Sequence, residues 1–360
     1  MKNKAKLFGI YLPIYLVILV ATVTLKTVSC FTSLNNYGYF TEPLMMNISA
    51  ALLGVGAIFF LFYIWTARRD LKLVPAFATA ANYVPSAAVS VALAFVAIHL
   101  FSIARVKLSA WYDTYLIFRE TVQYYPAIKM PTPEISSIIA LFAAVFAILS
   151  IVYFVFTGMI EKHISIRRAN YGLLALLFLC FYLAYIYFDT SLPINAPNKI
   201  SDQMAYLSAT LFFLYETRLS LGREKWRPYI SFGFIASLLT AFSSIPALII
   251  YFAEKRIISN SIYETLLTFA LFIFITAKLI LTANLIEDKK SAIVEGLILS
   301  AAKREQEINP NTEEAVETVE DDTAEEPDEN QISITDIGNE QTDTEPEGEF
   351  DDAEEKDELQ

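Results

Sequence analysis

Two oppositely charged residues stand inside otherwise apolar stretches of this sequence. Glu216 interrupts the apolar run that begins at Met204, and Lys278 lies within residues 262–285. Desolvating an ionisable side chain in a membrane costs several kcal/mol, so such residues are rare and either pair with one another or belong to a functional site. Both stand about two helical turns from the same end of their predicted helices. We therefore predict an intramembrane ion pair, either as a structural link or as part of a substrate or proton site.

Hydroxyl side chains gather in the middle of residues 229–252, directly before a proline. They are Ser237, Thr240, Ser243 and Ser244, followed by Pro246. Proline removes a backbone hydrogen bond and kinks a helix, and nearby hydroxyls re-satisfy the freed carbonyl inside a membrane. The sequence therefore predicts a kinked helix that either packs or lines a cavity. His99, in the apolar stretch 84–106, is a further candidate for cavity lining or for a hydrogen bond to a neighbouring helix.

The sequence lacks the residue combinations of the common catalytic and metal sites. Its two histidines, His99 and His163, are predicted on opposite sides of the membrane, so they cannot form a metal site of the usual kind. Neither a Walker A loop nor a Gly-rich dinucleotide motif is present. We therefore predict no metal, no cofactor and no catalytic residue, and we interpret the protein as non-enzymatic.

The most distinctive stretch is Tyr215-Glu216-Thr217-Arg218 followed by Gly222-Arg223-Glu224-Lys225-Trp226-Arg227-Pro228. Residues 211–250 resemble stretches of bacterial multi-spanning membrane proteins. The resemblance implies a bacterial membrane protein and carries no activity with it. By composition the stretch is a cationic, aromatic turn, which either orients a membrane protein or binds a partner.

Helices that cross a membrane must hold these residues. A span needs roughly 20 mostly apolar residues to cross the ~30 Å hydrocarbon core. The segments that qualify are about 7–29, 47–67, 84–106, 135–158, 170–188, 203–222, 229–252 and 262–285. The sixth is the weakest, because Glu216 and Arg218 follow its apolar part. We predict an all-α, polytopic integral membrane helix bundle of about eight transmembrane helices.

Small residues recur at helical spacing on several of these segments. In lipid, close packing of small residues does much of the work of helix association. Ala50, Gly54 and Ala57 share one face of the second span, and the third, fourth and seventh spans carry similar ridges. The pattern predicts a compact bundle and is equally expected of a channel, a receptor or a scaffold.

Basic residues are divided unequally between the two sides of the predicted bundle. One side carries 17 Lys and Arg residues and the other seven. Because cytoplasmic loops retain an excess of Lys and Arg, we predict that both termini are cytoplasmic. The longest loop on the opposite side, 107–134, is aromatic, and we interpret it as a short helix on the membrane surface or as a binding lid.

The two cysteines carry little information. Thr27-Val28-Ser29-Cys30 resembles a lipoprotein cleavage box, but Thr27 replaces the usual Leu and Lys26 intrudes, so we interpret the first segment as a plain span. Cys180 lies inside the fifth span, at a different depth, so no disulfide with Cys30 is expected. We expect Cys180 to have a packing role only.

The C-terminal part of the sequence differs sharply in composition from the rest. Residues 305–360 contain 24 acidic residues and one basic residue, Lys356. Such a segment cannot bury enough apolar surface to offset chain entropy, so we predict a disordered acidic tail. Residues 286–304 before it have the pattern of an amphipathic juxtamembrane helix. On the cytoplasmic side, the tail is suited to binding a basic protein partner; the bilayer is the other expected partner.

These observations favour a non-enzymatic sensor, scaffold or regulator with an acidic cytoplasmic interaction tail. The alternative is a transporter or permease with its site between the sixth, seventh and eighth spans. Ion-coupled carriers usually keep a charged residue near the middle of the bilayer, and no predicted span has one there, which argues against the alternative.

Overall fold

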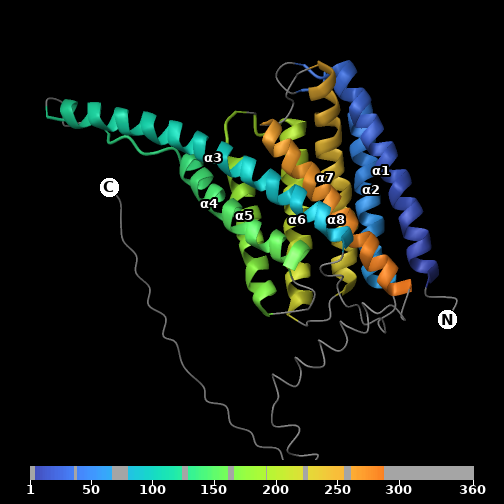
Figure 1. Ribbon diagram of the computed structural model, residues 1–360. Coiled ribbons are helices and arrows are strands. Elements are labelled where there is room, and N and C mark those ends of the chain that lie inside the picture. Colours follow the sequence, from blue (N-terminus) through green and yellow to red (C-terminus); the bar gives the residue numbers. More distant parts are fainter. Residues whose placement is uncertain are drawn as a thin grey trace, which may run out of the picture. The chain divides into compact units, whose positions relative to one another are not determined.

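The computed structural model describes residues 5–35, 39–66, 80–123, 129–160, 166–191, 193–221, 226–254 and 261–287. The acidic tail and nearly all of the predicted juxtamembrane helix lie outside these ranges. Within them every regular element is a helix (Figure 1). The helices are α1 (Ala5–Ser33), α2 (Leu44–Thr66), α3 (Ala80–Thr121), α4 (Ile135–Val155), a short π-helix η1 (Phe156–Ile160), α5 (Ile166–Phe188), α6 (Pro197–Ser220), α7 (Trp226–Glu254) and α8 (Ile262–Glu287).

Seven of the described helices are long and apolar enough to cross a membrane. The exception is α6, which carries Lys199, Asp202, Glu216 and Arg218 among its 24 residues. The chain is thus a multi-pass membrane protein, and the predicted all-α helix bundle is confirmed. The segment predicted from the sequence as the weakest span, α6, is thus the helix that is not apolar enough to be a candidate span.

Six helices form a closed ring. Each helix from α3 to α7 packs against the next one in the chain, and α8 packs back against α3. Consecutive helices run in opposite directions (Figure 1). We call the end at which α2, α4, α6 and α8 begin the even-helix end, and the other the odd-helix end. Since α6 lies between α5 and α7, the ring is closed only because this charged helix is part of it.

Aromatic side chains from alternate helices meet inside the ring. Phe154 of α4, Phe213 of α6 and Phe274 of α8 contact one another, with ring centroids 5.1 to 5.8 Å apart. All three side chains are buried. Edge-to-face and stacked aromatic pairs add to the apolar burial that holds such a core. The interior of the ring is therefore filled by packed side chains around these three residues.

α1 and α2 lie outside the ring. They pack against each other and against α7 (Figure 1). The Tyr15 hydroxyl of α1 and the Ser237 hydroxyl of α7 share a hydrogen bond of 2.6 Å. The Ser231 hydroxyl of α7 donates to the Phe60 carbonyl of α2 at 2.6 Å. Cys30 is buried near the end of α1, Cys180 is exposed, and neither forms a disulfide.

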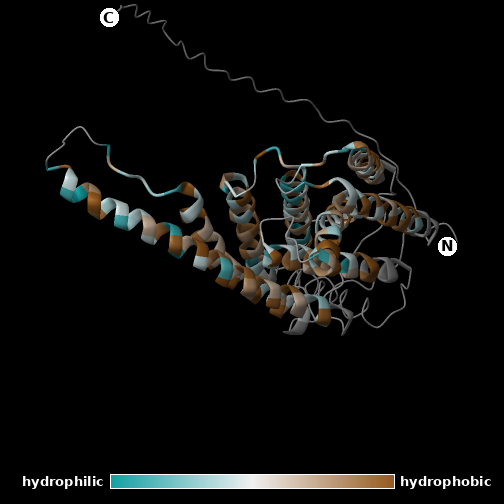
Figure 2. Cartoon of the chain, turned by 90° about the horizontal axis from the view of Figure 1, so that it is seen from above, coloured by the Kyte–Doolittle hydropathy of each residue, from teal (hydrophilic) through white to brown (hydrophobic). Residues whose placement is uncertain are grey.

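α3 is much longer than the span predicted at 84–106. Its 42 residues correspond to about 63 Å at 1.5 Å per residue. The C-terminal half of α3 projects from the bundle (Figure 1), and hydrophilic residues recur along it (Figure 2). The chain then returns along it, because Trp111 Nε1 donates to the Pro131 carbonyl at 3.1 Å. The first half of the predicted loop 107–134 is thus a continuation of α3.

Candidate functional site

Glu216 and Lys278 lie together in the bundle. The Lys278 ammonium of α8 is 3.2 Å from Glu216 Oε1 of α6, and each side chain is 1% exposed. The ammonium also lies 5.5 Å from the centroid of the Phe274 ring. Two charges so deeply buried neutralise each other, which lowers the cost of taking both out of water.

Gly233 of α7 sits where α6 and α8 both approach that helix. A Cβ at this position would lie 2.6 Å from Leu279 Cδ2 of α8 and 3.3 Å from Phe212 Cε2 of α6. Only glycine permits so close an approach of the two neighbours. The missing side chain therefore helps to bring the helices of Glu216 and Lys278 within reach of one another.

The hydroxyl cluster of α7 is largely engaged in hydrogen bonds. Ser237 lies 2.6 Å from the Tyr15 hydroxyl and 2.6 Å from the Thr276 hydroxyl of α8. Thr240 and Ser244 donate to backbone carbonyls one turn back in α7. Such back-bonding satisfies a buried hydroxyl within its own helix. Pro246 lies inside α7, two residues after Ser244.

His99 lies apart from the other residues proposed to line a cavity. Its ring centroid on α3 is 5.2 Å from that of Tyr263 on α8. It therefore belongs to the contact that closes the ring of helices. The hydroxyls of α7 lie elsewhere in the bundle, and the structure does not bring His99 together with them.

Ser243 leads to a second buried charge cluster. Its hydroxyl donates to the Asp202 carboxylate of α6. Asp202 in turn interacts electrostatically with Lys26 of α1, a side chain that is 1% exposed. The Lys26 ammonium stands 4.3 Å from the centroid of the Phe242 ring of α7. A cation over an aromatic face gains further stabilisation when it is desolvated.

The sequence reading missed this cluster, because it placed both charges at the margins of their spans. Lys26 lies inside the candidate span Tyr11–Ser33, since α1 continues to Ser33. Asp202 stands in the second turn of α6, which begins at Pro197. The sequence did contain a signal, because Lys26 is the one charged residue in a long apolar stretch. Its burial also weakens the argument against a transporter, which relied on spans free of interior charge.

A groove of about 680 Å³ opens between α2 and α6, with α7 as its floor. We call it the lateral groove. Its floor consists of Phe232, Ile235, Leu239 and Phe242. Its α2 wall runs from Pro43 to Leu61, which corresponds to roughly 27 Å of helix. This is most of the ~30 Å thickness of a bilayer core.

One face of α2 opens into this groove. Ala50, Gly54 and Ala57 line it, and a Cβ on Gly54 would meet nothing within 4 Å. The comparable ridge on α4 behaves as predicted, because Ala140, Ala144 and Ala147 are buried. The ridge on α2 therefore faces open space instead of a neighbouring helix.

Polar side chains line the lateral groove mainly at the even-helix end. Tyr39 precedes α2, Asn47 is in its first turn, and Ser201 is in the second turn of α6. Beyond them the walls are almost wholly apolar, with Ser208 as the further polar member. An apolar groove with polar side chains at one end is complementary to an amphiphile, which has an apolar chain and a polar head group.

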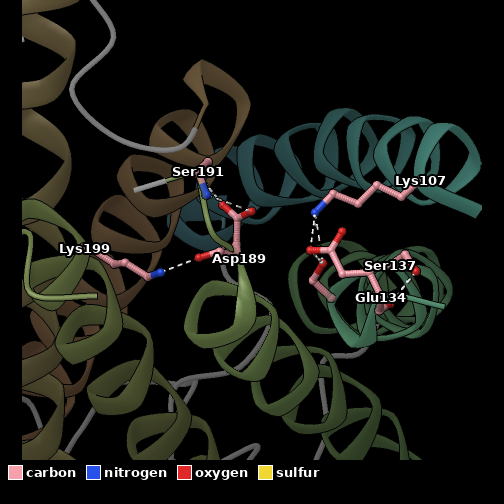
Figure 3. A network of polar contacts seen from close by, with 7 residues as sticks. Lys107, Glu134, Ser137, Asp189, Ser191 and Lys199 are labelled. Carbon is pink, nitrogen blue, oxygen red and sulfur yellow. Dashed lines mark hydrogen bonds and ion pairs between the residues drawn. The ribbon is translucent and has the colours of Figure 1, made fainter. Parts of the chain in front are cut away.

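A network of polar contacts fastens the connections at the even-helix end (Figure 3). The Lys199 ammonium donates to the Asp189 carbonyl at 2.5 Å, and the Ser191 hydroxyl donates to the Asp189 carboxylate. These contacts join the end of α5 to the start of α6.

The same end of the bundle holds an ion pair between α3 and α4. Lys107 lies 3.0 Å from the Glu134 carboxylate, which also accepts from the Ser136 hydroxyl at 2.6 Å (Figure 3). The hydrogen bond from Ser136, together with Lys107, holds the pKa of Glu134 below its usual range. Because the Glu134 side chain is 47% exposed, water screens the pair and its contribution to stability is small.

Comparison of the chain with protein families, with curated proteins and with solved structures gave no match. The functional interpretation therefore depends on the geometry of the bundle itself.

Proposed function

We propose that this multi-pass membrane protein is a non-enzymatic sensor or regulator, and that it binds an amphiphilic molecule from the bilayer in the lateral groove. The single observation that carries the proposal is the shape and lining of this groove. Two of its three helices, α2 and α7, are candidate membrane spans, so its open side would face lipid tails. Its volume of about 680 Å³ is within the range of roughly 300–1,000 Å³ of small-molecule sites.

The lining of the groove indicates how an amphiphile would lie. An acyl chain would follow Gly54 and Leu239 along the bundle, and the head group would stand near Asn47 and Ser201. Burial of each methylene group stabilises such a complex by about 0.8 kcal/mol. The polar mouth would favour one orientation of the molecule, because a buried polar group without a partner is costly.

The buried charges provide a route from the groove to the rest of the bundle. Phe242 lines the groove and lies next to the Lys26 ammonium. Ser201 also lines it and directly precedes Asp202 in α6. An occupant of the groove would thus contact the helices that carry the Lys26–Asp202 pair. In this proposal the acidic tail, residues 305–360, carries the response to a basic cytoplasmic protein.

The proposal is tested by photo-crosslinking the purified protein to a phospholipid with a photoactivatable acyl chain. We expect labelled peptides from the α2 and α6 walls of the groove. Gly54→Phe should fill the groove without a clash, since its Cβ has open space around it. Excluding two or more methylene groups should weaken binding by at least about tenfold.

Val55→Phe is the matched control. Val55 is 63% exposed and does not line the groove, so the same added ring there should leave the labelling unchanged. Equal labelling of the two variants would contradict the proposal. Labels spread evenly over all exposed helices would contradict it as well.

A second candidate function, a transporter or permease, is favoured by the charges inside the bundle. Asp202 of α6 and Ser243 of α7 form part of the site expected between spans six, seven and eight. If transport occurs, proteoliposomes should move the amphiphile between leaflets, and Asp202→Asn should abolish the movement. Binding without movement would favour the sensor. Loss of specific partners on truncation at Ala302 would support the role of the tail.

A further inference from the structure

A small polar cavity lies between α5, α6 and α8. Its volume is about 10 Å³, which is close to the volume that one water molecule needs. Its lining is rich in oxygen atoms: Asp202, Glu264, Tyr182, Tyr206, Thr265 and Thr268, with Ile186 as the apolar member. Among the described residues, those that line the cavity include no basic one.

The Tyr182 hydroxyl marks this cavity as a binding site. Tyr182 is fully buried, and its hydroxyl oxygen interacts with the Tyr206 side chain but has no partner at full hydrogen-bond geometry among the described residues. It interacts electrostatically with the Glu264 carboxylate, which belongs to the same cavity. A buried hydroxyl left without a partner costs free energy, so the site favours a small polar or charged occupant beside it.

Other members of the lining are held in place by their neighbours. The Tyr206 hydroxyl lies 2.8 Å from that of Thr268. Glu264 stands three residues after Ser261, whose hydroxyl accepts from the Glu264 backbone N–H at 3.2 Å. This is the arrangement of a capping residue at the start of a helix, and it fixes the backbone of the first turn of α8. Tests of the cavity are directed at Tyr182 and Thr268, because their substitution removes a hydroxyl and leaves the charge of the cavity unchanged.

We infer that this cavity binds one small monovalent cation, of the size of Na⁺, through the oxygens of Asp202, Glu264, Tyr182 and Thr268. Carboxylate and hydroxyl oxygens are suitable ligands for such a hard cation. Two carboxylates in one buried space repel each other, and a cation between them relieves the repulsion. A divalent ion fits less well, because the Lys26 ammonium also acts electrostatically on Asp202 and because Ca²⁺ takes six or more oxygens.

The inference is tested by thermal unfolding of the full-length protein in detergent, in NaCl, LiCl, KCl or choline chloride at equal ionic strength. A ligand that binds only the folded state raises the melting temperature. We expect Na⁺ and Li⁺ to raise it by about 3 °C or more over choline at saturation. K⁺, which is larger, should have little effect.

Tyr182→Phe removes only the hydroxyl and should abolish the Na⁺ shift. Tyr185→Phe is the matched control, because Tyr185 is a buried tyrosine one turn along α5 that does not line the cavity. Thr268→Val serves as a second variant if Tyr182→Phe fails to fold. Equal melting temperatures in all four salts would show that the cavity holds only water and would overturn the inference. A Na⁺ shift that persists in both Tyr182→Phe and Thr268→Val would also overturn it. Neither result bears on the lateral groove.

Discussion

Two buried charge pairs differ in what surrounds them. The Glu216–Lys278 pair lies among the packed side chains of α6, α7 and α8, and each member is 1% exposed. Lys26 and Asp202 each adjoin a cavity: the Phe242 ring beside the Lys26 ammonium lines the lateral groove, and Asp202 lines the small polar cavity. The first has the surroundings of a structural link, and the second has the surroundings of a responsive site.

The Glu216–Lys278 pair leads to a prediction about stability. Glu216→Gln and Lys278→Met should each lower the thermal stability in detergent, because each leaves an uncompensated charge in a low-dielectric site. Breaking a buried pair typically costs roughly 3–5 kcal/mol, whereas removing both members is often close to neutral. The double variant should therefore recover much of the loss, as a double-mutant cycle would measure.

The same cycle distinguishes a link from a functional site. Additive damage in the double variant would show that the two side chains do not interact. Recovery of stability together with amphiphile binding would make the pair a structural link. Recovery of stability with loss of binding would make it part of the site. We expect recovery of stability together with amphiphile binding.

At the scale of the helices, two glycines have opposite surroundings. Gly233 is enclosed by Leu279 and Phe212, whereas Gly54 has open space where a Cβ would stand. The first glycine serves close packing between α6, α7 and α8. The second widens the lateral groove.

This contrast predicts opposite effects of one substitution. Gly233→Ala should destabilise the protein by about 1–3 kcal/mol, because overpacking forces its neighbours to shift. Gly54→Ala should be neutral or stabilising by up to about 1 kcal/mol, since alanine favours a helix over glycine. Chemical unfolding of both variants in the same detergent measures the difference. Equal effects would mean that the tight contact at Gly233 can relax without cost.

At the scale of the whole molecule, the main question is whether α6 crosses the membrane. Its four charged residues keep it below the apolar character of the other helices. Its place between α5 and α7 nevertheless lets neighbouring helices cover Glu216, and lets Asp202 bond to Ser243. We propose that α6 is the eighth span, with both termini in the cytoplasm.

Reporter fusions test this topology. Fusions after Lys72, Arg168, Arg227 and Ala302 should report the cytoplasm, and fusions after Asn36, Lys129, Asn198 and Ser259 the opposite side. The pair Asn198 and Arg227 is decisive, because these positions flank α6. The same signal from both would mean that α6 does not cross, and the eight-span arrangement would then be wrong.

Local sequence alone was sufficient to predict the class of fold and the positions of most helices. Apolar runs of about 20 residues must be helical in lipid, since every backbone polar group needs a partner within the chain. The same reasoning identified Glu216 and Lys278, because a charge inside an apolar run needs compensation wherever the helix packs. Equal depth and opposite sign predicted their partnership, and the structure places them 3.2 Å apart.

Only the tertiary structure decided which neighbours the remaining residues meet. Helical spacing places Ala50, Gly54 and Ala57 on one face but does not reveal whether a helix or a groove lies opposite. Lys26 and Asp202 come together because α1 and α6 both pack against α7, a contact between segments far apart in the chain. Hydropathy is a sum over neighbours in sequence, whereas the burial of a charge depends on neighbours in space.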